Sequence, residues 1–362
     1  MNNHDLLDAA ELALAGYGQF LSVGTPSIAR LKVLNEDLAG FAESQAKKFS
    51  ERFRLPIPTY NDATRPLSDE DRRLGISQTS FDVSVFQGQT GSIKDQIYLA
   101  IRGTQQKKVD IPSDLSANAE ILLGHGAASQ IVAMVNWWWR VSATKESLVP
   151  QYHIETRSDP SSPPAGAVLL SRVSDHPPLW DYLVQTAKVL STGELADALQ
   201  TSGGVTVTGS SMGGHLAMAF AALFGGQVKQ AVAFNAPGFP DNEYLRNLFT
   251  GLGGTLPRVG DAKILNVVSS EEADPADDLN VVAGFPDGNF PGRKLLLPIE
   301  DQTFSDVPDP KTPSGNHDQR IHDEQKVSIS VDQVLLDARR TGVGDRSMSL
   351  RQSMKVIAEL RN

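Results

Sequence analysis

A strand, a glycine-rich turn and an apolar helix follow one another at residues 204–226, and they constrain the fold more than any other part of the chain. The run VTVT alternates apolar and polar residues, GSSMGG consists mostly of small residues, and HLAMAFAALF is apolar over a helical length. Residues 209–213 fit the pattern G-x-S-x-G, in which a serine lies on a sharp turn between a strand and a helix. Ser211 is therefore a candidate nucleophile, and the alternative is a glycine-rich turn without chemistry.

Strand and helix patterns alternate along the rest of the chain. We expect strands at 81–87, 95–103, 204–209, 227–238 and 262–270, and helices at 5–22, 26–52, 117–143, 177–199 and 212–226. Residues 56–66 and 157–167 are rich in loop-forming residues. The alternation predicts an α/β fold with a mostly parallel central sheet and helices on both faces.

We expect one domain over residues 1–362. It would carry an N-terminal helical extension at 1–60, a lid-like insertion at 105–165 and a C-terminal helix at 331–362. No internal repeat divides the chain.

Composition excludes several classes of function. The formal net charge of −10 argues against nucleic acid as the main partner and against an anionic membrane surface. No apolar run approaches the ~18 residues that a membrane span needs, and the N-terminus lacks the basic start of a secretory signal. The chain has no cysteine, so either a reducing or an oxidising compartment is compatible with it. We therefore expect a soluble protein that is cytoplasmic or exported without a leader.

Two segments resemble a known family. IYLAIRGT (97–104) with DIPSDLSANAE (110–120), followed by TGSSMGGHLAMAFA (208–221), is similar to the class 3 lipases and the bacterial lipases and phospholipases related to them. The resemblance covers about residues 85–325 and implies an α/β-hydrolase fold. Ile101 stands where the family usually has an aromatic residue. Asp110 and Asp114 fall where members often have an acidic residue, although they could equally be solvated loop carboxylates.

An acyl-transferring serine needs two donors for the oxyanion that forms during the reaction. The backbone N–H of Met212, directly after the serine, supplies one. The second is expected after a neighbouring buried strand, and the resemblance implies this role for Thr104.

Chain order selects the acid and the base, because the triad of this fold follows the order Ser, Asp or Glu, His. Asp274 follows the strand predicted at 262–270 and resembles the acid of the family, while Glu271 and Glu272 lie nearer the strand end. His317 and His322 alone follow the acid loop, and His317 matches the resemblance better. His215 lies one turn beyond Ser211 and is expected to pack or to bond a neighbouring loop.

These residues predict hydrolysis of a carboxylic ester through an acyl-enzyme on Ser211, which needs no metal or organic cofactor. The resemblance implies that the substrates are lipid esters, either acylglycerols or phospholipids, which the protein would bind at a lipid–water interface. Trp137, Trp138 and Trp139 either contact lipid or belong to the core, and we expect at least one in the core. A carboxylesterase for small esters and a silent binding or delivery module are the alternatives. The sequence leaves the oligomeric state open.

Overall fold

The computed structural model describes residues 3–34, 40–103, 125–175, 177–186, 188–270 and 291–298. Within them, the largest sheet has eight strands in the order β1-β3-β4-β10-β11-β12-β13, with β2 paired to β3. Its parallel part consists of β4 (Ile97–Ile101), β10 (Val205–Ser210), β11 (Val228–Phe234), β12 (Ile264–Ser270) and β13 (Arg293–Pro298). The antiparallel edge consists of β1 (Phe53–Arg54), β2 (Tyr60–Asn61) and β3 (Asp82–Gly88). The predicted α/β class and the mostly parallel sheet are confirmed.

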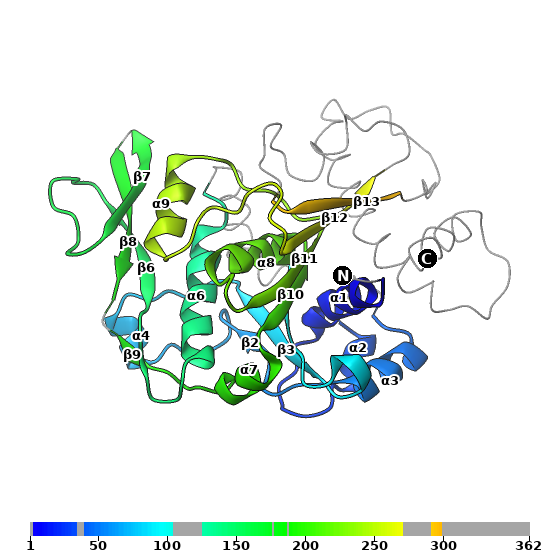
Figure 1. Ribbon diagram of the computed structural model, residues 1–362. Coiled ribbons are helices and arrows are strands. Elements are labelled where there is room, and N and C mark those ends of the chain that lie inside the picture. Colours follow the sequence, from blue (N-terminus) through cyan, green and yellow to red (C-terminus); the bar gives the residue numbers. More distant parts are fainter. Residues whose placement is uncertain are drawn as a thin grey trace, which may run out of the picture.

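Helices cover both faces of this sheet (Figure 1). α1 (Asn3–Ala15) lies on one face, while α6 (Ala128–Ser142) and α8 (Met212–Leu223) lie on the other. The alternation of side chains in β4 fits this arrangement. Leu99 and Ile101 belong to the core cluster beneath α6 and α8, whereas Tyr98 and Ala100 pack with the N-terminal helices.

The N-terminal helices form a compact layer of their own around aromatic side chains. α1 is followed by the 3₁₀ turn η1 (Gly16–Gly18), and then by α2 (Ile28–Lys32) and α3 (Glu43–Arg52). Phe49 lies at the centre of the layer and contacts the rings of Phe41, Phe53 and Phe86. Arg52 forms ion pairs with Asp8 and Glu11 and so joins α3 to α1. The helical patterns predicted at 5–22 and 26–52 are confirmed in outline.

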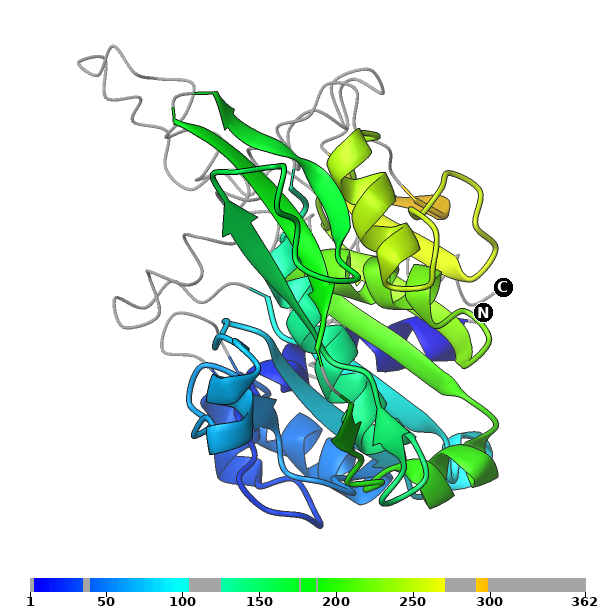
Figure 2. The same ribbon diagram turned by 90° about the vertical axis from the view of Figure 1, so that its left-hand side faces the viewer.

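A smaller antiparallel sheet replaces the helix predicted at 177–199. β8 (Pro178–Gln185) pairs with β6 (Tyr152–Arg157) and with β7 (Val168–Asp175), and only α7 (Ala196–Ser202) is helical at the end of this region. The helix prediction was wrong because partners on both sides of β8 satisfy its backbone groups in a ladder. Figure 2 shows this sheet in front of the molecule, and α9 (Glu243–Gly251) contacts β7.

Short elements complete the described part of the chain: α4 (Asp69–Arg73), η2 (Gly91–Ile93), β5 (Leu148–Val149) and β9 (Val189–Leu190). The predicted C-terminal helix at 331–362 and most of the first half of the predicted insertion lie outside the described residues. No helix in the described ranges is long and apolar enough to cross a membrane.

Candidate active site

Ser211 lies on the turn between β10 and α8. Its backbone has φ 53° and ψ −123°, which is outside the regions that L-residues normally occupy. Such a conformation costs about 1–3 kcal/mol and persists only where the surroundings impose it. Here the Ser211 N–H donates to the carbonyl oxygen of Phe234 at 2.8 Å, and the Ser211 carbonyl accepts from the N–H of His215 at 3.1 Å. The strain therefore falls on the residue that the sequence pattern identifies as the nucleophile.

The flanking glycines are required by the close approach of backbone to backbone. A Cβ atom on Gly213 would lie 2.2 Å from the carbonyl oxygen of Ile101. A Cβ atom on Gly209 would lie 2.4 Å from the carbonyl carbon of Gly213, and one on Gly214 would lie 2.7 Å from Cβ of Ala236. Any side chain at the first two positions would push the helix away from the sheet. The spacing of small residues thus has a steric cause.

The two adjacent serines differ in their surroundings. Ser210 is the last residue of β10, pairs with Phe234 and is only 8% exposed. Ser211 is exposed, and its side chain makes no capping hydrogen bond although it occupies the N-cap position of α8. A serine at an N-cap normally uses its hydroxyl to satisfy a backbone N–H of the first turn. The Ser211 hydroxyl is not used in this way.

The start of α8 provides donors beside this serine. The first N–H groups of a helix lack partners within the helix and carry a partial positive charge. Met212, whose N–H is the predicted oxyanion donor, begins α8 and is buried. An anion that formed beside Ser211 would meet the positive end of the helix.

The end of β4 lies against the turn. β4 and β10 are parallel neighbours, and Gly209 pairs with Ile101. A Cβ atom on Gly103 would lie 2.5 Å from the carbonyl oxygen of Ser210. The preceding Arg102 forms an ion pair at 3.0 Å with Asp82, and both side chains are fully buried. Thr104, the predicted second donor, follows Gly103 in sequence and lies outside the described residues.

His215 bonds two loops, as expected. Its Nδ1 lies 3.0 Å from the carbonyl oxygen of Pro237, and its Nε2 lies 2.9 Å from that of Gly126. The ring stacks on Phe239 with centroids 3.9 Å apart. Burial lowers the pKa of His215, because hydrogen bonds to backbone carbonyls offset only part of the desolvation. His215 lies between these two carbonyl oxygens and holds the first turn of α8 against both loops; as a neutral imidazole it donates to one of them, according to its tautomer.

A second cluster next to this histidine was not predicted. His125, which precedes Gly126, stacks on Tyr244 of α9 with centroids 4.2 Å apart and planes at 9°. The Tyr244 hydroxyl donates to Asp181 at 3.2 Å, and Asp181 also accepts from Thr156 at 2.6 Å. Burial lowers the pKa of His125, against the opposing charge of Asp181. Sequence offered no signal for this cluster, because four segments that are separate in sequence contribute to it.

The remaining predicted site residues lie outside the described part of the chain. They are Asp110, Asp114, Glu271, Glu272, Asp274, His317 and His322. Within the described ranges, no group of three histidine, aspartate or glutamate side chains is placed to hold a metal ion.

The three tryptophans of α6 do not form a lipid-facing surface. Trp138 is fully buried, packs edge-on against Phe220 and donates from Nε1 to Oε1 of Gln227 at 2.9 Å. Trp137 is only 4% exposed. Trp139 is partly buried and packs against the same core. The core interpretation is correct for Trp137 and Trp138.

Distant structural likenesses to solved proteins include two lipases. Lip2 lipase from Yarrowia lipolytica is similar with a TM-score of 0.34 and 14% identity, over 80% of this chain and 79% of that one. A triacylglycerol lipase from Penicillium expansum is similar with a TM-score of 0.27 and 12% identity, over 82% of this chain and 79% of that one. No protein-family model and no curated protein matches the sequence.

Proposed function

We propose that the protein is a serine hydrolase of the α/β-hydrolase type that cleaves carboxylic esters of lipids through an acyl-enzyme on Ser211. The observation that carries this proposal is the strained, exposed Ser211 between β10 and α8, with its hydroxyl free of the capping bond. A serine that only filled a turn would gain from capping α8, and it would not need glycines on both sides.

In the proposed reaction, the Ser211 hydroxyl attacks the ester carbonyl and an acyl-enzyme forms as the alcohol leaves. A histidine takes the serine proton and returns it to the leaving alcohol, and water then releases the acid by the same route. We propose His317 as this base and Asp274 as the carboxylate that orients it. The sequence position of Asp274 supports this, since it follows the end of β12, and β12 lies next to β11 in the sheet.

The N–H of Met212 and the residue Thr104 are the proposed oxyanion donors. Support comes from the close contact between Gly103 and the Ser210 carbonyl, because Thr104 is the next residue in the chain. Removal of one oxyanion donor in a serine hydrolase typically costs about 2.7–4 kcal/mol of transition-state stabilisation.

A panel of nitrophenyl esters with acetyl, butyryl and palmitoyl chains tests the substrate class. We expect turnover to rise with chain length and to increase when the long-chain ester forms micelles. Turnover of short esters alone would identify a carboxylesterase for small substrates. Lack of turnover of every ester, also with acylglycerols and phospholipids, would contradict the hydrolase proposal.

A further inference from the structure

A cavity of about 390 Å³ lies on the side of α6 that faces away from α8. Ala133, Asn136 and Arg140 contribute one wall, spaced three and four residues apart on one face of the helix. Segments 57–65, 75–79, 151–154 and 192–194 supply the rest. The volume lies at the lower end of the range of about 300–1,000 Å³ that is typical of small-molecule pockets.

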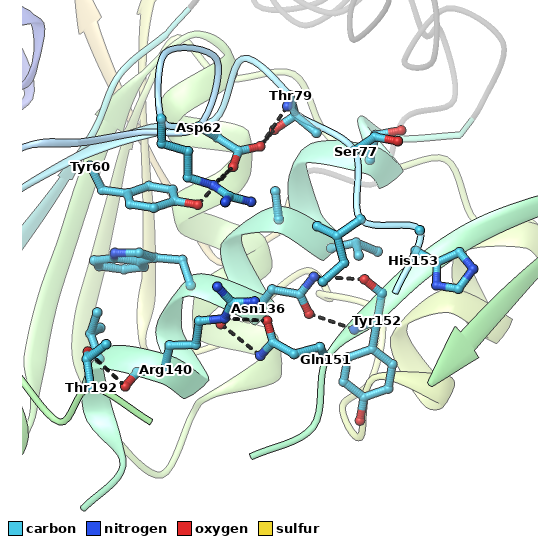
Figure 3. A pocket seen from close by; sticks show the side chains of 18 of the residues that line it. Tyr60, Asp62, Ser77, Thr79, Asn136, Arg140, Gln151, Tyr152, His153 and Thr192 are labelled. Atoms are coloured by element: carbon cyan, nitrogen blue, oxygen red, sulfur yellow. Dashed lines mark hydrogen bonds and ion pairs between the residues drawn. The ribbon is translucent and has the colours of Figure 1, made fainter. Parts of the chain in front are cut away.

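Two buried carboxylates brace this pocket, and both are saturated with donors. Asp62 accepts from the Tyr60 hydroxyl at 2.8 Å, from Arg65 Nε at 2.7 Å, and from the N–H and hydroxyl of Thr79 at 2.6 and 2.9 Å. Figure 3 shows this group across the pocket from Arg140. Burial, and next the charge of Asp62, raise the pKa of Tyr60 far above its usual range, so its hydroxyl stays a donor.

Asp71 is bonded in the same way. It accepts from Arg65 Nη1 and Arg140 Nη2, both at 2.8 Å, and from the N–H and hydroxyl of Ser68 at 3.1 and 2.8 Å. Burial alone would raise the pKa of Asp71, but the hydrogen bonds from Arg140, Ser68 and Arg65 outweigh it and lower the pKa well below the usual range. Asp71 is therefore charged, and Asp62 and Asp71 form ion pairs with Arg65 and Arg140.

The amide side chains of the pocket are also satisfied. Asn136 accepts from the N–H of Tyr152 and donates to its carbonyl oxygen, both at 2.8 Å. Gln151 accepts from Arg140 Nε at 2.7 Å and donates to the carbonyl oxygen of Asn136 at 3.2 Å. The side-chain oxygens of Asp62, Asp71, Asn136 and Gln151 are thus all occupied.

Donor groups remain at the two arginines. A guanidinium has five N–H donors. The bonds above engage Nε and Nη1 of Arg65 and Nε and Nη2 of Arg140, which leaves Arg65 Nη2 and Arg140 Nη1 without a partner in the described ranges. The pocket therefore offers donors without net positive charge. Apolar side chains form much of the remaining lining: Ile57, Ile76, Val132, Val141 and Ile154, with the rings of Tyr60, Trp137 and Tyr152.

We propose that this pocket binds an uncharged small molecule with an apolar or aromatic body and a carbonyl or similar acceptor oxygen, which receives hydrogen bonds from Arg65 and Arg140. The acceptor satisfies the remaining guanidinium donors, and the body fills the apolar lining. A carboxylate would compete with Asp62 and Asp71 for arginines that are already neutralised. An ammonium group would meet the like charges of Arg65 and Arg140, the groups that donate into the pocket.

This site is separate from the proposed ester site. Neither Ser211 nor Met212 lines it, and the helix face that forms its wall is opposite Trp138, which packs on α8. The proposal thus stands independently of whether Ser211 is a nucleophile.

Three probes of nearly equal shape test the class of ligand by ligand-observed NMR titration of the full chain. They are benzylacetone, which carries a ketone, hydrocinnamate, which carries a carboxylate, and phenylpropylamine, which carries an ammonium. We expect benzylacetone to bind at least tenfold more tightly than either charged probe. Equal or tighter binding of hydrocinnamate or phenylpropylamine, or no binding of benzylacetone, would overturn the proposal.

A pair of substitutions at Ala133 locates the binding. Ala133 lines the pocket and is only partly buried, so a larger side chain extends into the cavity without breaking the hydrogen bonds of its walls. Ala133→Leu should weaken benzylacetone binding at least tenfold, and Ala133→Ser should leave it within twofold. Near-ultraviolet circular dichroism checks that both variants are folded. Unchanged binding in folded Ala133→Leu would contradict the proposed location, and loss of fluorophosphonate labelling of Ser211 in that variant would contradict the separation of the two sites.

Discussion

Nε2 of His215, one turn beyond the candidate nucleophile, lies 2.9 Å from the carbonyl oxygen of Gly126, in the loop that precedes α6. The other ring nitrogen is held by Pro237 in the loop after β11. One buried imidazole thus joins the turn that carries Ser211 to loops from two other parts of the chain. His215 is a positioning residue and not a second base, since its ring is fully buried between these two carbonyl oxygens.

This arrangement predicts a pH dependence of stability. The folded pKa of His215 lies below its unfolded value of about 6.5, so the unfolded chain binds more protons at mildly acidic pH. The contribution is complete above pH 6.5 and falls as the pH drops below it, by at most about 1.4 kcal/mol per pH unit. Urea unfolding between pH 7.5 and 5.5 measures this, and His215→Gln should be less stable at pH 7.5 yet show a shallower dependence. An unchanged slope in this variant would exclude His215 as the source, and His125→Gln then tests the other histidine whose pKa is lowered.

The glycines of the turn predict a sharp contrast between two similar substitutions. Gly213→Ala places a Cβ atom 2.2 Å from the carbonyl oxygen of Ile101 and should lower the free energy of unfolding by about 1–3 kcal/mol or more. Gly226→Ala is the control, because a Cβ atom there meets nothing within 4 Å. The urea midpoints of the two variants measure this difference in stability. Equal stability would show that the turn is looser than described.

The strand–turn–helix segment could be predicted because its pattern has local causes. Apolar and polar residues alternate in β10, close backbone contacts require glycine at positions 209 and 213, and α8 is apolar. All three features lie within one stretch of chain. The helix prediction for residues 178–185 was wrong because Leu179 and Leu183, four residues apart with two aromatic residues between them, also fit helical spacing. The pairing of β8 with β6 and β7 makes this segment a strand. The stack of His125 on Tyr244 and the pocket beside α6 depend on segments far apart in sequence, so no local pattern indicates them.

The buried ion pair between Arg102 and Asp82 should be costly to break. Asp82→Asn removes the buried carboxylate that pairs with Arg102 at the end of β4, and we expect a loss of about 3–5 kcal/mol in stability. Asp69→Asn is the matched control. Asp69 pairs with Arg72 at the surface, where both side chains are exposed, so this substitution should cost less than about 1 kcal/mol. Denaturant titration compares the two. An equal loss of stability in both variants would contradict the expectation that burial makes the Arg102–Asp82 ion pair costly to break.

The tryptophans of α6 should act through the core and not through lipid contact. Trp138→Ala removes a fully buried ring and should cost about 3–5 kcal/mol, whereas Trp139→Ala should cost less because Trp139 is partly exposed. In folded preparations, neither substitution should change the ratio of activity on micelles to activity on a soluble ester. A selective loss on micelles would restore the interpretation that this segment contacts lipid.

The proposed nucleophile can be tested directly by labelling with a fluorophosphonate and mapping the modified peptide by mass spectrometry. Wild type should carry one label, on Ser211, and Ser210→Ala should still be labelled because Ser210 is buried in β10. Ser211→Ala should be unlabelled and inactive towards every ester, with an unchanged urea midpoint. A label on another residue, or ester hydrolysis by Ser211→Ala at the wild-type rate, would contradict the account.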